Sequence, residues 1–248
     1  MGLEVYRYLD RISGALLPPR CILCGSRGQA PCLDLCGYCQ ADLPARNGPA
    51  CVRCGAATTG PGCGLVCADC LADPPPMDRC FAAFDYSFPI DSLICSFKYR
   101  GRLALGRVLG TLLAEAVAAR SLHLDVDLLL PVPLHPGRQA ERGFNQSAEI
   151  ARWTGRRIGR EVSGDYLRRC LDTRPQVSLS QISRRRNVQG AFEVLRSLEG
   201  ARVVIIDDVL TTGSTAAELA GCLRRAGAGS VDAWCLAQAA GGALARAG

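Results

Sequence analysis

Lysine is almost absent from this chain. Of the 29 basic residues, Lys98 is the single lysine and all the others are arginine, with a formal net charge of +6. Arginine side chains suit the paired oxygens of phosphate groups and nucleic acids. However, a GC-rich genome produces the same bias, and the charge is spread along the whole chain. The composition alone therefore does not identify a partner.

A long hydrophobic run is also missing. No uninterrupted apolar stretch approaches the roughly 20 residues that a membrane-spanning helix needs. The start of the chain lacks the basic segment followed by an apolar one that is typical of a secretory signal. Residues 1–19 are instead expected to form an amphipathic helix that packs on its own protein; binding to a membrane surface or a partner is the less favoured alternative. We therefore expect a cytoplasmic protein with no transmembrane segment and with reduced cysteines.

Two common nucleotide-binding motifs do not occur either. The chain has no G-x-x-x-x-G-K-[ST] sequence, and no G-x-G-x-x-G sequence follows a predicted strand. These are the loops that hold phosphates in P-loop proteins and in dinucleotide-binding folds. A nucleotide or sugar phosphate must therefore be bound by another kind of loop.

Cysteine, in contrast, is abundant, and ten of the 15 cysteines lie within residues 21–70. Each Cys-x-x-Cys pair supplies two thiolates, and two pairs complete a tetrahedral zinc shell. The spacing therefore predicts a double zinc ribbon over residues 20–73 that binds two Zn²⁺ ions. The expected ligands are the eight paired cysteines: Cys21, Cys24, Cys36, Cys39, Cys51, Cys54, Cys67 and Cys70.

The details of this cysteine-rich region stay open at this point. Cys32 and Cys63 have no pair of their own, and either could replace a neighbour as a ligand. Disulfides are the alternative, which a reducing compartment and the regular spacing disfavour. Most ribbons only stabilise a segment that is too small to fold alone, and some bind nucleic acid.

The pattern changes after Pro74-Pro75-Pro76, which is predicted to be a stiff boundary. Residues 77–248 contain aliphatic strands without strict alternation, separated by segments with helical spacing, which predicts a parallel sheet covered on both faces. The expected strands are 80–86, 126–132, 202–207 and 230–237, and the expected helices are 103–120, 145–159 and 214–228.

The segment VVIIDDVLTTGST at residues 203–215 places two carboxylates after a buried strand and before a helix. Neighbouring side chains of a strand point to opposite faces, so Asp207 and Asp208 need not repel each other. They can accept hydrogen bonds from sugar hydroxyls or hold Mg²⁺, and the loop that follows forms an anion-binding nest. A capped helix after an acidic strand end is the alternative interpretation. The predicted ribose-phosphate site comprises Asp207, Asp208, Thr211, Thr212, Gly213, Ser214 and Thr215.

Two further segments complete the predicted site. The turn after the strand at 126–132 is expected to bind pyrophosphate through its backbone amides, with arginine and lysine side chains nearby; a solvated charged turn is the alternative. The basic segment at 173–192 has the composition of a mobile lid, or of an exposed helix. The pyrophosphate candidates are Val132, Pro133, Leu134, His135, Arg138, Arg142 and Lys98, and the lid candidates are Arg184, Arg185, Arg186 and Asn187.

The motifs CILCG, LCGYC, CVRCG, CADC, FKYRG, PVPLHPGRQAERGFNQ, RRRNVQGAF and VVIIDDVLTTGST occur in this order over most of the chain. In this combination the sequence resembles the ComF family of bacterial competence proteins. The resemblance implies an α/β fold with a type I phosphoribosyltransferase-like parallel sheet after a double zinc ribbon. It also implies binding of phosphoribosyl pyrophosphate (PRPP) with Mg²⁺, and handling of single-stranded DNA together with DNA-uptake proteins during natural transformation.

Two functions follow from this reading. In the first, the protein is a phosphoribosyltransferase, and Asp207 and Asp208 are catalytic residues that stabilise a cation-like ribosyl group as pyrophosphate departs. The acceptor is not identified by any motif. In the second, the protein is a binding module, in which ribbons and arginines hold single-stranded DNA and the PRPP site senses a ligand.

Overall fold

The computed structural model describes residues 19–29, 33–58, 65–171 and 188–239. The helix expected over residues 1–19 lies almost entirely outside this part of the chain. The lid candidates at 184–187 and the unpaired Cys32 and Cys63 also lie outside it.

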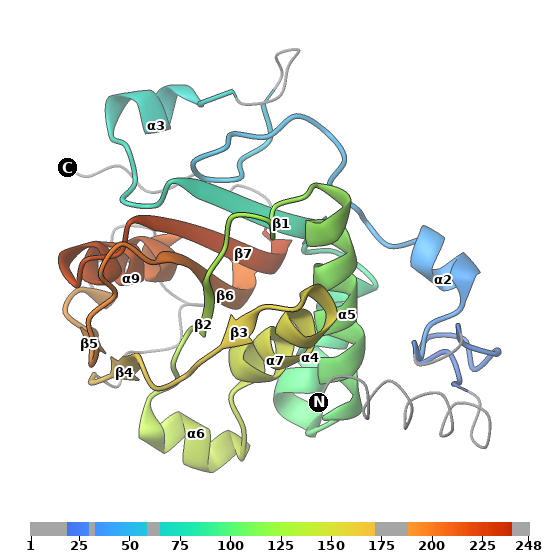
Figure 1. The fold of residues 1–248 in the computed structure, drawn as a ribbon. Helices are drawn as coiled ribbons and strands as arrows, with labels where there is room; N and C mark the ends of the chain where they lie inside the picture. The colour runs from blue at the N-terminus through green and yellow to red at the C-terminus, as the bar shows by residue number, and fades with distance from the viewer. Residues whose placement is uncertain (1–18, 30–32, 59–64, 172–187, 240–248) are drawn as a thin grey trace.

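A five-stranded sheet forms the centre of the molecule (Figure 1). All of its strand pairings are parallel, which confirms the predicted sheet type. Val203 to Ile206 are buried on both faces, which is why the strand sequence lacks alternation. In sheet order the strands are β1 (Arg79–Asp85), β7 (Ser230–Gln238), β6 (Arg202–Leu210), β2 (Leu128–Pro131) and β3 (Glu161–Val162).

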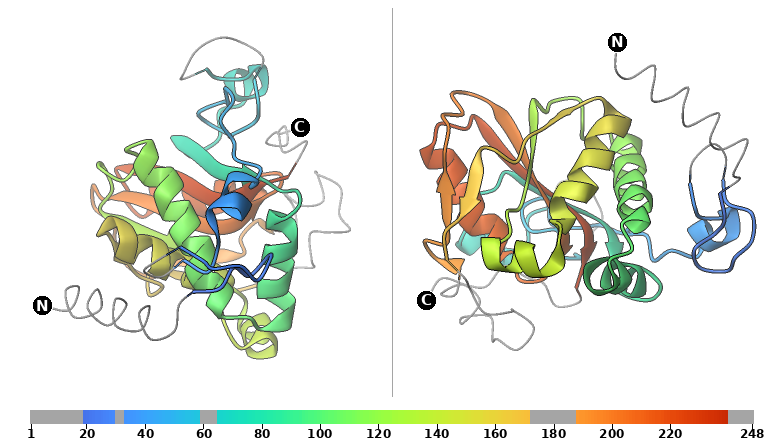
Figure 2. Two further views of the ribbon diagram at one scale, coloured as in Figure 1. Left: turned by 90° about the vertical axis from the view of Figure 1, so that its right-hand side faces the viewer. Right: turned by 90° about the horizontal axis from the view of Figure 1, so that it is seen from below.

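Helices cover both faces of the sheet (Figures 1 and 2). On one face, α4 (Ile90–Arg100), α5 (Ala104–Ala119) and α7 (Gln146–Ile158) pack over Val204 and Ile206. On the other face, α9 (Ser214–Arg225) packs over Val203 and Ile205. No helix in the described ranges combines the length and the apolar character needed to cross a membrane.

Smaller elements extend this frame. The strands β4 (Leu167–Arg169) and β5 (Phe192–Val194) pair antiparallel beside α9. The segment that carries Arg138 and Arg142, for which a solvated charged turn was the alternative interpretation, forms the helix α6 (Pro136–Arg142), which begins with a proline and ends at Gly143 in the left-handed conformation. Within the cysteine-rich region lie two short helices, α2 (Gly37–Ala41) and α3 (Ala68–Ala72).

The two ribbons contact the α/β domain at different places (Figure 1). In the first ribbon, Leu33 and Leu35 join the same apolar cluster as α5, and Arg107 of α5 pairs with Asp34. The second ribbon is bound by hydrogen bonds to the edge of the sheet. The amide of Cys80 in β1 donates to the Val52 carbonyl at 2.7 Å. The first ribbon thus packs as part of the α/β core, whereas the second has a small cluster of its own, formed by Cys51, Cys54 and Cys70, and is attached to the edge of the sheet.

Candidate functional site

The eight predicted zinc ligands form two compact groups, one in each ribbon. In each group the four Sγ atoms lie within 4.8 Å of one another. The Sγ atoms of Cys24 and Cys36 are 3.7 Å apart, as are those of Cys54 and Cys67. A tetrahedral zinc ion with Zn–S bonds of about 2.3 Å places its sulfur ligands about 3.8 Å apart. The described cysteines form no disulfide. Both groups therefore fit the two predicted zinc sites.

The thiols of the second group influence each other's ionisation. Burial and the charge of Cys51 raise the pKa of the Cys54 thiol to about 12. At Cys51 the effect of burial is outweighed by amide donors such as Cys67 N–H, at 3.3 Å, and the pKa falls to about 7. A metal ion bound by the four sulfur atoms would offset this repulsion, because it lowers the pKa of each ligand.

The acidic pair lies inside β6, which continues to Leu210 instead of ending at Asp207 as predicted. Asp208 is buried and forms an ion pair with Lys98 of α4, the only lysine of the chain. Asp207 accepts a hydrogen bond from the hydroxyl of Ser147, at the start of α7, at 2.9 Å. The two carboxylates therefore have separate partners.

Separate partners do not make the two acids independent. Burial and the charge of Asp208 raise the pKa of Asp207 to about 7, although Lys98 and Ser147 act in the opposite direction. Burial lowers the pKa of Lys98, but the charge of Asp208 outweighs it and the net shift is upward. Strand alternation alone thus does not remove the repulsion, and Lys98 supplies the compensating charge.

The loop after β6 turns sharply into α9. Gly213 has φ = 72°, which favours glycine, and its carbonyl accepts the first helical hydrogen bond from Ala217 at 2.8 Å. The hydroxyls of Thr212 and Ser214 are buried and bond to each other at 2.8 Å. Thr211 and Thr215 are half-buried. The loop thus has the tight turn at a helix N-terminus that an anion nest requires.

The second predicted loop lies beside the acids. Val132 donates its amide to the Ile206 carbonyl at 3.0 Å, one residue before Asp207. Its own carbonyl accepts from the side chain of Asn145 at 3.0 Å. Pro133, Leu134 and His135 follow and are half-buried. The carboxyl ends of β2 and β6 therefore bring the predicted pyrophosphate turn and the predicted ribose acids together.

The basic residues predicted to bind pyrophosphate lie on two different helices. Arg142 donates to the Gln146 side chain at 2.6 Å, and its guanidinium carbon lies 5.5 Å from the centre of the Tyr99 ring. Arg138 is half-buried in α6. Lys98 is held by Asp208 rather than by the turn at 132–135. The two arginines thus lie on α6, directly after the turn, and the lysine lies on α4.

Comparisons with known proteins agree with the double zinc ribbon and identify the family. A family model described as a double zinc ribbon domain matches residues 12–71. The DNA utilization protein YhgH of Salmonella typhimurium is 34% identical over 223 residues, which cover 89% of this chain and 97% of the relative. Competence protein F of Haemophilus influenzae is 32% identical over 226 residues, with the same coverage of 89% and 97%. The chain belongs to the ComF family.

Solved structures are more distant. A purine phosphoribosyltransferase from Pyrococcus horikoshii aligns with a TM-score of 0.35 at 18% identity, over 52% of this chain and 73% of its own. A hypoxanthine phosphoribosyltransferase from Staphylococcus aureus aligns with a TM-score of 0.38 at 18% identity, over 56% and 68%. Similarity at this level says nothing about the ligand of this ComF protein, whose fold rests on the sheet and helices described above.

Ser147 is a site residue that sequence reasoning missed. It is fully buried and donates to Asp207. A signal for it was present, because a helix was predicted from residue 145 and Asn145 caps it by accepting from the amides of Ser147 and Ala148. A serine in the first turn after such a cap is held in a fixed position. Nothing in the sequence indicated that this turn would lie against β6.

Replacing Lys98 by methionine is expected to lower the free energy of unfolding by about 3–5 kcal/mol, because it leaves the buried Asp208 without its counter-ion. Urea denaturation with zinc present measures the effect. In the double variant Lys98→Met/Asp208→Asn, most of the loss should be recovered. Equal stability of the wild type and the single variant would show that Lys98 does not stabilise the buried Asp208 carboxylate.

Asp207→Asn is expected to raise the free energy of unfolding by an amount that depends on pH. The folded-state pKa of about 7 lies above the usual value of 3.8, so ionising Asp207 costs the folded state free energy as the pH rises. The advantage of asparagine should therefore grow by at most about 1.4 kcal/mol per pH unit up to about pH 7, and then level off. Denaturation between pH 5.5 and 8.5 tests this, with the exposed Asp165→Asn as the control. A constant difference would contradict it.

Proposed function

We propose that this ComF-family protein binds PRPP, or a similar ribose 5-phosphate, together with Mg²⁺, and that it acts in DNA uptake by handling single-stranded DNA. One observation carries the proposal for the ligand. Two buried-strand carboxylates, a tight glycine turn and a helix N-terminus follow each other within nine residues, 207–215, beside a second loop at 132–135. In a ribose phosphate the sugar hydroxyls and the phosphate belong to one small molecule, so the groups of the protein that bind them must also be neighbours.

Each group of the chain has a task in this model. Asp207 and Asp208 accept hydrogen bonds from the two ribose hydroxyls, and Ser147 keeps the Asp207 carboxylate in place. The amides and hydroxyls of residues 211–215 bind the 5′-phosphate. The backbone amides of Leu134 and His135 bind the pyrophosphate, because the Val132 amide is donated to Ile206 and Pro133 has no N–H. Mg²⁺, when bound, neutralises phosphate charge, and the acidic pair provides the oxygen atoms near which it would bind.

Titration calorimetry tests the ligand. PRPP with Mg²⁺ is expected to bind with one site per chain, ribose 5-phosphate more weakly, and glucose 6-phosphate not at all. Pyrophosphate should compete with PRPP but not with ribose 5-phosphate, because the two parts of the ligand occupy different loops. Equal binding of glucose 6-phosphate and PRPP would mean that the loop binds any phosphate and that the carboxylates do not distinguish ribose from other sugars.

The DNA part of the proposal is supported by the names of the relatives and by one surface. Tyr99 of α4 is 71% exposed, and the guanidinium of Arg142 lies over its ring. Aromatic rings beside arginines stack on unpaired bases while the cations contact phosphates. Single-stranded oligonucleotide is therefore expected to bind with an affinity that falls steeply as salt rises. Tyr99→Ala should weaken binding several-fold, and affinity that does not depend on salt would contradict this.

An active phosphoribosyltransferase is the second candidate function. The position of the 132–135 turn next to Asp207 favours it, because pyrophosphate held there would be the leaving group of an attack on ribose C1. The acidic pair would then stabilise positive charge that develops on the ribosyl group. Exchange of labelled pyrophosphate into PRPP tests this candidate across a set of bases, and a complete lack of exchange would leave ligand binding as the function.

A further inference from the structure

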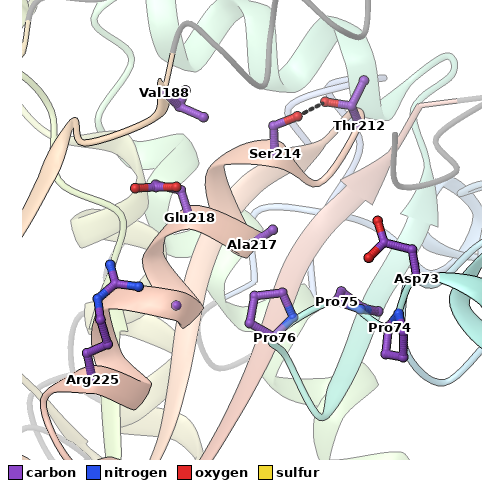
Figure 3. A pocket seen from close by; sticks show the side chains of 11 residues that line it. Asp73, Pro74, Pro75, Pro76, Val188, Thr212, Ser214, Ala217, Glu218 and Arg225 are labelled. Carbon is purple, nitrogen blue, oxygen red and sulfur yellow. Dashed lines mark hydrogen bonds between the residues drawn. The ribbon is translucent and has the colours of Figure 1, made fainter. Parts of the chain in front are cut away.

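A cleft of about 320 Å³ lies between the proline segment and α9, next to the phosphate loop (Figure 3). We name it the linker cleft; its walls are Pro74–Pro76 on one side and the outer face of α9 on the other. One of its ends is formed by Thr212 and Ser214 of the loop. Its volume is at the lower end of the range for pockets that hold small organic ligands.

The cleft is fixed by contacts on the proline side. Met77, directly after the prolines, is fully buried, and its carbonyl accepts from Arg53 of the second ribbon at 3.2 Å. The Asp78 carboxylate pairs with Arg224 of α9 and accepts from the amide of Val231 at 2.9 Å. The wall is thereby attached to the ribbon, to α9 and to β7. A cleft built in this way exists before any ligand arrives, which lowers the free-energy cost of binding.

The α9 wall is flat at its centre and polar at its edges. Ala217 and Gly221 lie one turn apart, and a Cβ atom added to Gly221 would contact only the tip of Arg225, at 3.4 Å. Packing therefore does not require this glycine, although glycine is less favourable than alanine inside a helix. It leaves open space opposite the proline rings. Glu218 borders this space, with one carboxylate oxygen held by the amide of Gly190 at 2.9 Å.

The charged residues that line the linker cleft indicate which chemical group it can bind. The lining carries two carboxylates, Asp73 and Glu218, and one guanidinium, Arg225. A further phosphate would meet net negative charge, whereas a neutral ring with amino groups can donate to a carboxylate. Flat apolar walls suit an aromatic ring, and arginine stacks on such rings. A nucleobase has all of these properties.

We propose that the linker cleft binds the nucleoside of a nucleoside diphosphate ribose, whose terminal ribose phosphate lies in the site at residues 207–215. This inference rests on the proposed function, because Thr212 and Ser214 belong to both the phosphate loop and the cleft. A nucleoside that enters the cleft at Thr212 and Ser214 can therefore be linked to the phosphate that the loop binds. The nucleobase lies against Pro74–Pro76 and Gly221, and its amino group donates to Glu218.

Calorimetric titration of the full chain with ADP-ribose and with ribose 5-phosphate tests the proposal. ADP-ribose is expected to bind at least about tenfold more tightly, because the base adds one well-packed contact surface. Gly221→Leu fills the cleft and should remove this advantage while leaving ribose 5-phosphate unchanged. Glu218→Gln, which keeps the side chain's size, should weaken ADP-ribose by about tenfold through the loss of a charged acceptor and serves if Gly221→Leu does not fold.

Two results would overturn the proposal, and they are distinguishable. If wild type binds ribose 5-phosphate and ADP-ribose equally, or if the cleft variants weaken both ligands alike, the cleft holds no nucleoside although the ribose-phosphate site stands. If neither ligand binds and PRPP with Mg²⁺ also fails to bind, the proposed function fails and the cleft proposal fails with it. Loss of both ligands in Asp208→Asn, with loss of ADP-ribose alone in Glu218→Gln, supports it.

Discussion

Asp208→Asn is expected to weaken binding of PRPP with Mg²⁺ by about 100-fold or more. The change keeps the shape of the side chain but removes the buried carboxylate that, in the proposed site, accepts from ribose or faces the metal ion. Removing one charged partner from a buried polar contact costs about 2–5 kcal/mol, which corresponds to a factor of about 30 to several thousand in affinity. The substitution also leaves Lys98 buried without its counter-ion, so stability and binding must be measured separately.

The double variant Asp208→Asn/Lys98→Met separates these effects. It removes both charges of the buried pair, so it should fold nearly as well as the wild type and still bind PRPP about 100-fold more weakly or worse. The exposed Asp165→Asn is a matched control that should bind normally. Binding within about threefold of wild type in the double variant would show that Lys98 and Asp208 form only a structural ion pair, and ribose recognition would have to be placed elsewhere.

Cys54→Ser is expected to have the largest effect on stability. It should reduce the zinc content from two ions per chain to one and lower the melting temperature by about 10 °C or more, given about 2–4 °C per kcal/mol for a chain of this size. The reason lies in where the second ribbon is attached. The carbonyl of Cys54 accepts from the buried side chain of Gln238 in β7 at 3.2 Å, and the carbonyl of Gly55 accepts from Arg46 at 2.6 Å.

The same attachment links the second zinc site to the ligand site. Gln238 pairs with Leu210, the last residue of β6 before the phosphate loop. A loosened ribbon should therefore weaken PRPP binding as well as stability. Metal analysis, thermal melting and PRPP titration of Cys54→Ser check both consequences, with Cys170→Ser, an exposed cysteine outside both clusters, as the control. Two zinc ions and an unchanged melting temperature would show that Cys54 is not a ligand.

Four of the five strands of the sheet and the cysteine clusters were predictable because their signals are local, whereas the two-residue strand β3 is too short to leave a pattern in the sequence. Each buried strand is a short aliphatic run, and each ribbon repeats a fixed spacing. The helix α4 was missed although Ile90, Leu93, Ile94 and Phe97 are spaced for it, because Pro89 gives its start no capping side chain. The helix α6 buries no residue, so only its terminal signals, Pro136 and Gly143, could have predicted it.

Contacts between residues that lie far apart in the sequence could not be predicted, because local patterns do not encode them. Lys98 and Asp208 meet because α4 packs across the face of the sheet that Val204 and Ile206 also line. No spacing in the sequence encodes that contact. The separate docking of the two ribbons likewise depends on Leu35 packing on α5 and on Gln238 reaching Cys54. Periodicity predicts elements, whereas such contacts follow from how the elements are packed.

A crystal structure of the protein with PRPP and Mn²⁺ in place of Mg²⁺ would place the ligand and the metal ion directly. We expect an anomalous Mn²⁺ peak beside Asp207 and Asp208, pyrophosphate density at residues 132–135, and the 5′-phosphate at the amides of residues 211–215. Metal peaks confined to the two cysteine clusters, with PRPP absent from the carboxyl ends of β2 and β6, would contradict this expectation.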